Sequence, residues 1–227
     1  VAMSNRIPIL FLPGDTYANR MPDPVLQQVE HFNNPGITAN DAFKPVTRYF
    51  DRITRPEQIL QSLPQAIQVM IDPGDSGPAC LSLCQDIQGE TFDYPEDFFK
   101  EKIHTIRRPK PDDFEIKNAA EKIKSSKNPI IISGGGVFYS DAMEELGNFA
   151  VKHNIPVTQT VMGYSTMKKD HSHFLGPIGG LGGKAANNFA KKTDLAIAIG
   201  TKLADFTTGS WANFENPKFG LVSLNIT

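Results

Sequence analysis

Short apolar runs alternate with amphipathic stretches along the chain, and this alternation predicts strands that alternate with helices. In the first half, residues 7–12 and 78–83 are predicted strands, and apolar residues recur at helical spacing over 55–70. Thr54 is the expected N-cap of that helix, and residues 13–15 (Pro-Gly-Asp) are the expected turn after the first strand. Strand, helix and strand in this order form a βαβ unit, which implies a parallel sheet.

The second half repeats this pattern. Four strands are predicted, at residues 129–133, 155–160, 194–200 and 221–224, and two helices, one starting after Ser140 or Asp141 as N-cap and one over 185–192. Residues 175–178 carry no convincing strand pattern. Because the strands are almost continuously apolar, both faces of the sheet should be covered by helices. The fold class expected is therefore α/β, with doubly wound parallel sheets.

Composition indicates where the chain divides into domains and whether it is a segment of a longer protein. The chain has 227 residues, 40% of them hydrophobic, so it can form one large or two small packed domains. A polar, proline-bearing stretch over 90–115 is typical of a linker, and we place the linker proper at 101–115, between 1–100 and 116–227. The chain starts Val-Ala-Met and ends on a strand-like sequence. We therefore expect it to be an internal segment of a longer protein.

Charge and cysteine usage narrow the function classes. A net charge of −2 argues against nucleic-acid binding, which relies on a basic face. The apolar runs fall far short of the ~20 residues that span a bilayer, and no segment has the pattern of a signal peptide. Cys80 and Cys84 lie about 13 Å apart at strand rise, too far for a mutual disulfide. We expect a cytoplasmic protein with no membrane partner, in which both cysteines belong to the core.

Two glycine clusters follow predicted or suspected strands. Gly134–Gly136 resembles a phosphate-binding turn, but the dinucleotide fingerprint requires a glycine where Tyr139 stands, so a tight strand-to-helix turn is favoured. The second cluster, residues 179–184, lacks two residues of a P-loop. Its Gly180, Gly182 and Gly183 precede a predicted helix, where free N–H groups bind anions. An anion site and a simple packing turn both remain open for this cluster.

Other chemistry-bearing residues give weak signals. Residues 170–173 (Asp-His-Ser-His) lack a third histidine or cysteine nearby, so a solvated loop is favoured over a metal site. Neither cysteine has a neighbouring base that would make it a nucleophile. The sequence shows no Ser-His-Asp pattern, G-x-S-x-G or H-E-x-x-H. The residues themselves therefore identify no active site.

Taken in the order in which they occur along the chain, however, the segments resemble those of thiamine-diphosphate-dependent enzymes of the acetolactate synthase-like family. The strings that resemble the later part of their pyrimidine-binding domain are LFLPGDTYANRMPDPVLQQVEHF, ANDAFKPVTRYFDRITRPEQI and GPACLSLCQDIQGETFDYPEDFF. Those that resemble the Rossmann-like central domain are NPIIISGGGVFYS, NNFAKKTDLAIAIGTKLADFTTGSW and SLNIT. The PGDTYA and DFTTGS strings are the specific ones. The resemblance covers essentially the whole chain, but only about the middle third of such an enzyme.

The resemblance implies a function for the parent protein. It points to a hydrolase that opens a cyclic 1,2-diketone by cleaving a C–C bond in myo-inositol catabolism, with thiamine diphosphate and Mg²⁺ as cofactors and a homodimer or homotetramer as the assembly. By position in the resemblance, Asn40, Asp41 and Phe43 lie near thiamine diphosphate. Gly180, Gly182 and Gly183 are expected at a vestigial nucleotide site. The alternatives are an acetolactate synthase-like carboligase or decarboxylase, and a module that binds ADP or FAD.

Several family motifs are absent from this chain. The glutamate that activates the cofactor and the GDG…N motif that holds Mg²⁺ and diphosphate are not found, since Ser76 follows Gly74-Asp75 where the motif needs glycine. Flavin-binding relatives carry an arginine in the string corresponding to residues 200–206, where this chain has none. We therefore expect no catalytic residue in this chain, no tightly bound cofactor, and no activity of the segment alone.

Overall fold

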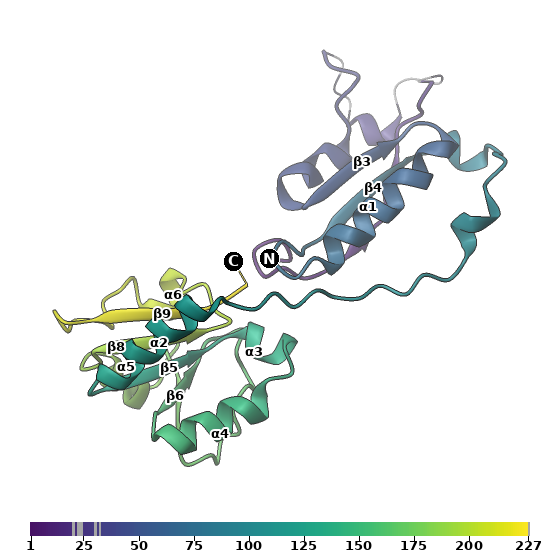
Figure 1. Cartoon of the computed structure of the whole chain (residues 1–227). Coiled ribbons are helices and arrows are strands. Elements are labelled where there is room, and N and C mark those ends of the chain that lie inside the picture. Colours follow the sequence, from purple (N-terminus) through teal and green to yellow (C-terminus); the bar gives the residue numbers. More distant parts are fainter. Residues whose placement is uncertain (20, 22–24, 30, 32, 227) are drawn as a thin grey trace. The chain divides into compact units, whose positions relative to one another are not determined.

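The computed structural model describes residues 1–19, 21, 25–29, 31 and 33–226, and they form two compact units. These units are residues 1–108 and 109–227, so the division falls within the segment 101–115 (Figure 1). The first helix of the second unit, α2 (Asp113–Ser125), begins inside that segment. The Asp112 carboxylate caps α2 by accepting a hydrogen bond from the Glu115 amide, 2.8 Å away.

The first unit is built on a parallel sheet centred on β4 (Ala79–Cys84). The strand β3 (Tyr49–Ile53) pairs with β4 along most of its length, while β1 (Leu10–Phe11) and β2 (Gly14–Asp15) pair with successive parts of it. Among its described residues this unit has one α-helix, α1 (Ile59–Ile71). Its 3-10 helices are η1 (Leu26–Gln28), η2 (Ala39–Val46), η3 (Pro56–Gln58), η4 (Ile87–Gly89) and η5 (Glu96–Phe99).

The helix α1 packs on one face of this sheet, and the expected strand–helix–strand order is confirmed with three corrections. The strand that leads into α1 is β3, which the sequence pattern did not predict. Gly14 and Asp15 form β2 rather than a turn. Thr54 is not the helix cap: the Gln58 side chain accepts hydrogen bonds from the Thr54 and Arg55 amides instead, at 2.6 and 2.9 Å. The N-cap of α1 is Gln58 itself, which makes no side-chain bond to the first turn of the helix.

The second unit contains a five-stranded parallel sheet in the order β7-β6-β5-β8-β9. Numbered from β5 along the chain, this order is 3-2-1-4-5, the arrangement of Rossmann-like folds. The strands are β5 (Pro129–Ser133), β6 (Val157–Gln159), β7 (Phe174–Pro177), β8 (Leu195–Ile199) and β9 (Gly220–Leu224). Besides α2, the helices are α3 (Gly135–Tyr139), α4 (Met143–His153), α5 (Lys184–Ala190) and α6 (Asp205–Thr208).

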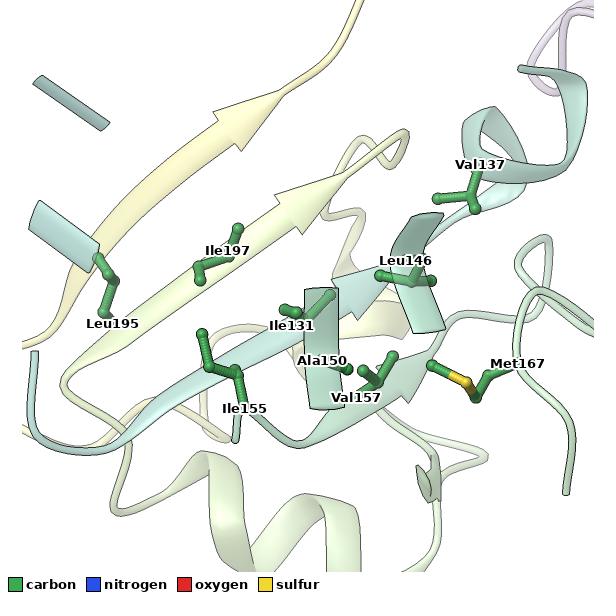
Figure 2. Close-up of a cluster of buried hydrophobic side chains, with 9 residues drawn as sticks. All are labelled: Ile131, Val137, Leu146, Ala150, Ile155, Val157, Met167, Leu195 and Ile197. Atoms are coloured by element: carbon green, nitrogen blue, oxygen red, sulfur yellow. The ribbon is translucent and has the colours of Figure 1, made fainter. Parts of the chain in front are cut away.

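Helices cover both faces of this sheet, which confirms the doubly wound α/β class. On one face, Leu146 and Ala150 of α4 pack against Ile131, Val157 and Ile197, and Figure 2 shows this cluster. The other face buries the alternate residues of the same strands against α5, in a cluster formed by Ile130, Ile132, Ile178, Ala186, Ala190 and Ala196. The three isoleucines 130–132 are therefore all buried, because neither face is open to water.

Two expectations for the second unit are wrong in detail. The chain continues into the short helix α3 directly after Gly134, so the next helix, α4, starts late and takes Ala142 as its N-cap instead of Ser140 or Asp141. Residues 174–177 do form a strand, β7, although the sequence pattern there is weak. The register of β7 against β6 shifts between Val157 and Thr158, which explains why regular alternation is absent.

Candidate functional site

The carboxyl ends of β2, β3 and β4 bring a set of polar side chains together beneath η2. Arg52 of β3 donates from Nε to Oδ2 of Asp15, 2.6 Å away, and from Nη2 to Oδ1 of Asp41, 2.9 Å away. The Asp15 side chain is fully buried, whereas that of Arg52 keeps 21% of its exposure. A single guanidinium thus bridges two carboxylates, and one of them is removed from water entirely.

Asn40 and Ser82 extend this arrangement into a continuous network. The Asn40 side-chain amide donates to the Gly14 carbonyl at 2.8 Å and to Ser82 Oγ at 2.7 Å, and Ser82 Oγ in turn donates to Asp15. We name the five residues Asp15, Asn40, Asp41, Arg52 and Ser82 the Arg52 cluster. Because each of its five side chains is bonded to another member, the cluster holds η2 firmly against the sheet.

The electrostatics of the cluster keep both carboxyl groups ionised. Burial alone would raise the pKa of Asp15, but hydrogen bonds from Ser82 and Arg52 outweigh it and hold that pKa below its usual value. The pKa of Asp41 is also lowered, since hydrogen bonds from Lys44 and the Thr38 amide and the charge of Arg52 outweigh burial. Burial opposes the charge of Arg52 too, yet the two carboxylates raise its pKa. All three groups are charged at neutral pH.

The sequence-predicted residues of the first unit all lie on η2. Asn40 and Asp41 are members of the Arg52 cluster, and the Phe43 ring packs edge-on against Phe11 with ring centroids 4.6 Å apart. Sequence reasoning missed Asp15, Arg52 and Ser82. Asp51 and Arg52 are adjacent charged residues in a half-buried strand, where charged groups need partners, and that was the available signal.

The cluster fits a neutral hydrogen-bonding group better than a diphosphate. Thr16, next to Asp15, is 5% exposed, and its buried hydroxyl has no hydrogen-bond partner among the described residues. Such a group suits a ligand that carries a matching hydrogen-bond donor or acceptor. The two carboxylates are balanced by Arg52 and Lys44, which leaves no spare cation for phosphate. Nor do the described residues contain a group of three or more side chains suited to a metal ion.

In the second unit, the strand order reverses between β5 and β8, where Rossmann-like folds bind ligands. Here backbone fills that position. The Gly136 amide donates to the Gly200 carbonyl at 3.0 Å, and a Cβ added to Gly134 would lie 2.3 Å from the same oxygen. Gly134–Gly136 therefore form the tight turn that the sequence favoured.

The glycines of the second cluster use their amides within the protein. Gly180 donates to the Phe206 carbonyl at 2.8 Å, Gly182 to Gly179 at 2.8 Å, and Gly183 to Pro177 at 2.9 Å. These three N–H groups are not free for an anion, so the geometry favours a packing turn. The nucleotide site stays a prediction that no described glycine amide supports.

The remaining chemistry-bearing residues are structural. His173 contacts Asn154 and Ser172 through its two ring nitrogens, at 3.1 and 3.0 Å. Cys80 and Cys84 are both buried and no disulfide joins them, as expected. Burial, with a smaller contribution from Asp15, raises the pKa of Cys80 to about 11. No helix of the described residues is long and apolar enough to cross a membrane.

Comparison with known proteins assigns the second unit to a family. Residues 116–227 match the model of the thiamine pyrophosphate enzyme, central domain, and this part of the chain belongs to that family. Over its whole length the chain is similar to 3D-(3,5/4)-trihydroxycyclohexane-1,2-dione hydrolases. It is 50% identical to that of Clostridium perfringens (strain 13 / Type A) and 47% identical to that of Bacillus subtilis (strain 168). The chain spans 35% and 36% of these two relatives, about a third of their length.

Proposed function

We propose that the protein containing this chain is a thiamine-diphosphate- and Mg²⁺-dependent hydrolase that opens trihydroxycyclohexane-1,2-dione in myo-inositol catabolism, in the cytoplasm. In this reaction water is added across the C–C bond between two carbonyl carbons, so one carbon becomes a carboxylate and the other an aldehyde. The observation that carries the proposal is the similarity to hydrolases of that name, which runs unbroken through both units at 46–50% identity.

We propose that this chain supplies scaffold and part of the cofactor pocket. The Arg52 cluster holds η2 in place, which presents Asn40, Asp41 and Phe43 at the carboxyl edge of the first sheet. The buried Thr16 hydroxyl beside it suits the aminopyrimidine ring of the cofactor. We infer that Mg²⁺, and with it the diphosphate, is held outside this chain, because the described residues contain no group of three or more His, Cys, Asp or Glu side chains that could hold a metal ion. The segment alone is therefore inactive.

Turnover by the full-length protein tests the substrate. With thiamine diphosphate and Mg²⁺ present, it should consume the cyclic dione and form a carboxylate, and it should leave pyruvate unchanged. Condensation or decarboxylation of pyruvate without hydrolysis of the dione would support the carboligase instead. The names of the similar proteins favour the hydrolase.

Calorimetry tests whether the 227-residue chain alone binds the cofactor. Thiamine diphosphate titrated into the 227-residue chain should give no heat, because the groups that hold diphosphate lie outside it. The full-length protein, expected to be a homodimer or homotetramer, is the positive control and should bind. Micromolar binding to the chain alone would refute this part of the proposal.

A further inference from the structure

The second unit has a small pocket beside the end of β6 that no function described above uses. Its volume is about 210 Å³, and it is lined by Gln159, Tyr164, Ser165, Met167, Lys168 and Lys169. Met167 belongs to the buried cluster of Figure 2, where it lies beside Val157, so the floor of the pocket is fixed by the core. The volume is below the ~300–1,000 Å³ typical of drug-sized ligands, which limits an occupant to a small molecule.

One lining side chain lacks a partner that its burial demands. Gln159 is 5% exposed, and its Oε1 has no hydrogen-bond donor among the described residues. A buried carbonyl oxygen without a donor is costly, and native proteins seldom retain one without a reason. Since Gln159 lines the pocket, a rotation of its side chain would turn this oxygen toward the opening, where a ligand O–H or N–H group can supply the missing bond.

The rim of the pocket carries positive charge. Lys168 and Lys169 are both exposed, and neither forms a salt bridge with any described carboxylate. The Lys169 ammonium lies 5.8 Å from the centre of the Tyr164 ring, which holds it near the opening. Two unpaired cations beside one buried acceptor select a molecule that has both a negative charge and a hydrogen-bond donor.

The loop that forms the pocket is rigidly attached to the sheet. The Thr166 hydroxyl bonds to the Ser133 hydroxyl and to the Gly163 carbonyl, both at 2.7 Å. The Gly163 amide is bonded in turn to Thr160. These bonds fix the backbone of the loop between Thr160 and Thr166, so that part of the pocket needs no ordering when a ligand binds.

We propose that this pocket binds a small hydroxylated anion, with a ligand hydroxyl on Gln159 Oε1 and the anionic group between Lys168 and Lys169. The evidence for the site is the geometry of the second unit alone. Carboxylates with several hydroxyls are also the product class of the proposed hydrolysis, and only that link rests on the proposed function.

Titration of the 227-residue chain with four probes tests the site, followed by the Gln159 side-chain amide signal in NMR spectra. D-Gluconate carries charge and hydroxyls on a carboxylate, glycerol 3-phosphate carries them on a phosphate, glucose lacks the charge, and acetate lacks the hydroxyls. One or both of the first two should bind at least tenfold more tightly than glucose and acetate, and their ranking identifies the anionic group. Equal binding of all four, or no binding at tens of millimolar, would overturn the proposal.

Two variants make the test specific. Gln159→Leu should weaken binding about tenfold while raising the melting temperature of the free chain, because an unsatisfied buried acceptor is removed. A merely structural glutamine would give a lower melting temperature. Lys168→Gln/Lys169→Gln should weaken binding roughly tenfold at low ionic strength. The matched control Lys122→Gln/Lys124→Gln removes the same charge from α2 and should leave affinity unchanged. Unchanged binding in both pocket variants refutes the site.

Discussion

Replacing Arg52 with methionine should destabilise the first unit strongly, because it leaves the buried Asp15 carboxylate without its cation. Removing one partner of a buried ion pair costs about 3–5 kcal/mol. Since the Arg52 side chain retains 21% of its exposure, we expect a loss near the lower end, about 3 kcal/mol. Arg55→Met is the matched control: its side chain is 75% exposed and its ion pair with Glu57 spans 4.0 Å, so the loss should stay below about 1 kcal/mol.

Urea unfolding separates this effect from the second unit. The chain has one tryptophan, Trp211, which lies in the second unit and reports on that unit alone. Circular dichroism reports on both units. The Arg52→Met change should therefore shift part of the circular dichroism transition to lower urea and leave the tryptophan transition in place. Equal losses for Arg52→Met and Arg55→Met would refute the account of the cluster.

The pH dependence provides an independent check on the same residues. The folded-state pKa values of Asp15 and Asp41 are lowered, so their stabilising contribution is complete above the unfolded value of about 3.9 and is lost as the pH falls through the folded values. In Arg52→Met the carboxyls can protonate more readily. The stability difference between parent and variant should thus shrink below about pH 4. A difference that stays constant down to pH 2.5 or so would contradict this electrostatic origin.

Two further changes test the second unit and the buried thiol. Gly200→Ala should cost roughly 2–4 kcal/mol in urea unfolding followed by Trp211, because Gly200 has φ +60° and a Cβ there would lie 2.5 Å from the Gly136 Cα. Gly183→Ala, where no atom lies within 4 Å, should cost under about 1 kcal/mol, and similar losses at both positions would disprove the close-packing argument. Cys80, with a pKa of about 11, should resist iodoacetamide at pH 8 in the native chain and react in urea. Rapid native labelling, located by mass spectrometry, would show that the thiol is accessible.

The sheet of the second unit could be predicted well because its strands are buried on both faces. Ile130–Ile132 and residues 195–199 form unbroken apolar runs, and such runs need no knowledge of distant partners. The strand β3 was missed because Asp51 and Arg52 interrupt its apolar pattern. Their partners, Ser62 for Asp51 and Asp15 for Arg52, lie 11 and 37 residues away in sequence. Local pattern carries no information on such pairs.

The candidate sites were also hard to predict, because their residues have partners that are distant in sequence. Asn40 and Asp41 were located by resemblance, but nothing in the sequence indicated that Arg52 would bridge Asp41 to a carboxylate on another strand. The amides of Gly180, Gly182 and Gly183 looked available because the carbonyls that accept from them, such as that of Phe206, could not be placed. Gln159 ends the short strand β6, and only three-dimensional packing shows that its oxygen lacks a donor.

The central position of β5 has a consequence for how the second unit is made. Ile131 pairs with Val157 on one side and with Ile197 on the other, 26 and 66 residues later in the chain. During synthesis, β5 can join α4 and β6 early, but its other edge must wait until β8 has left the ribosome. That edge is apolar and unpaired in the interval, and such edges recruit foreign strands. Translation speed across residues 160–200 should therefore influence the yield of soluble protein.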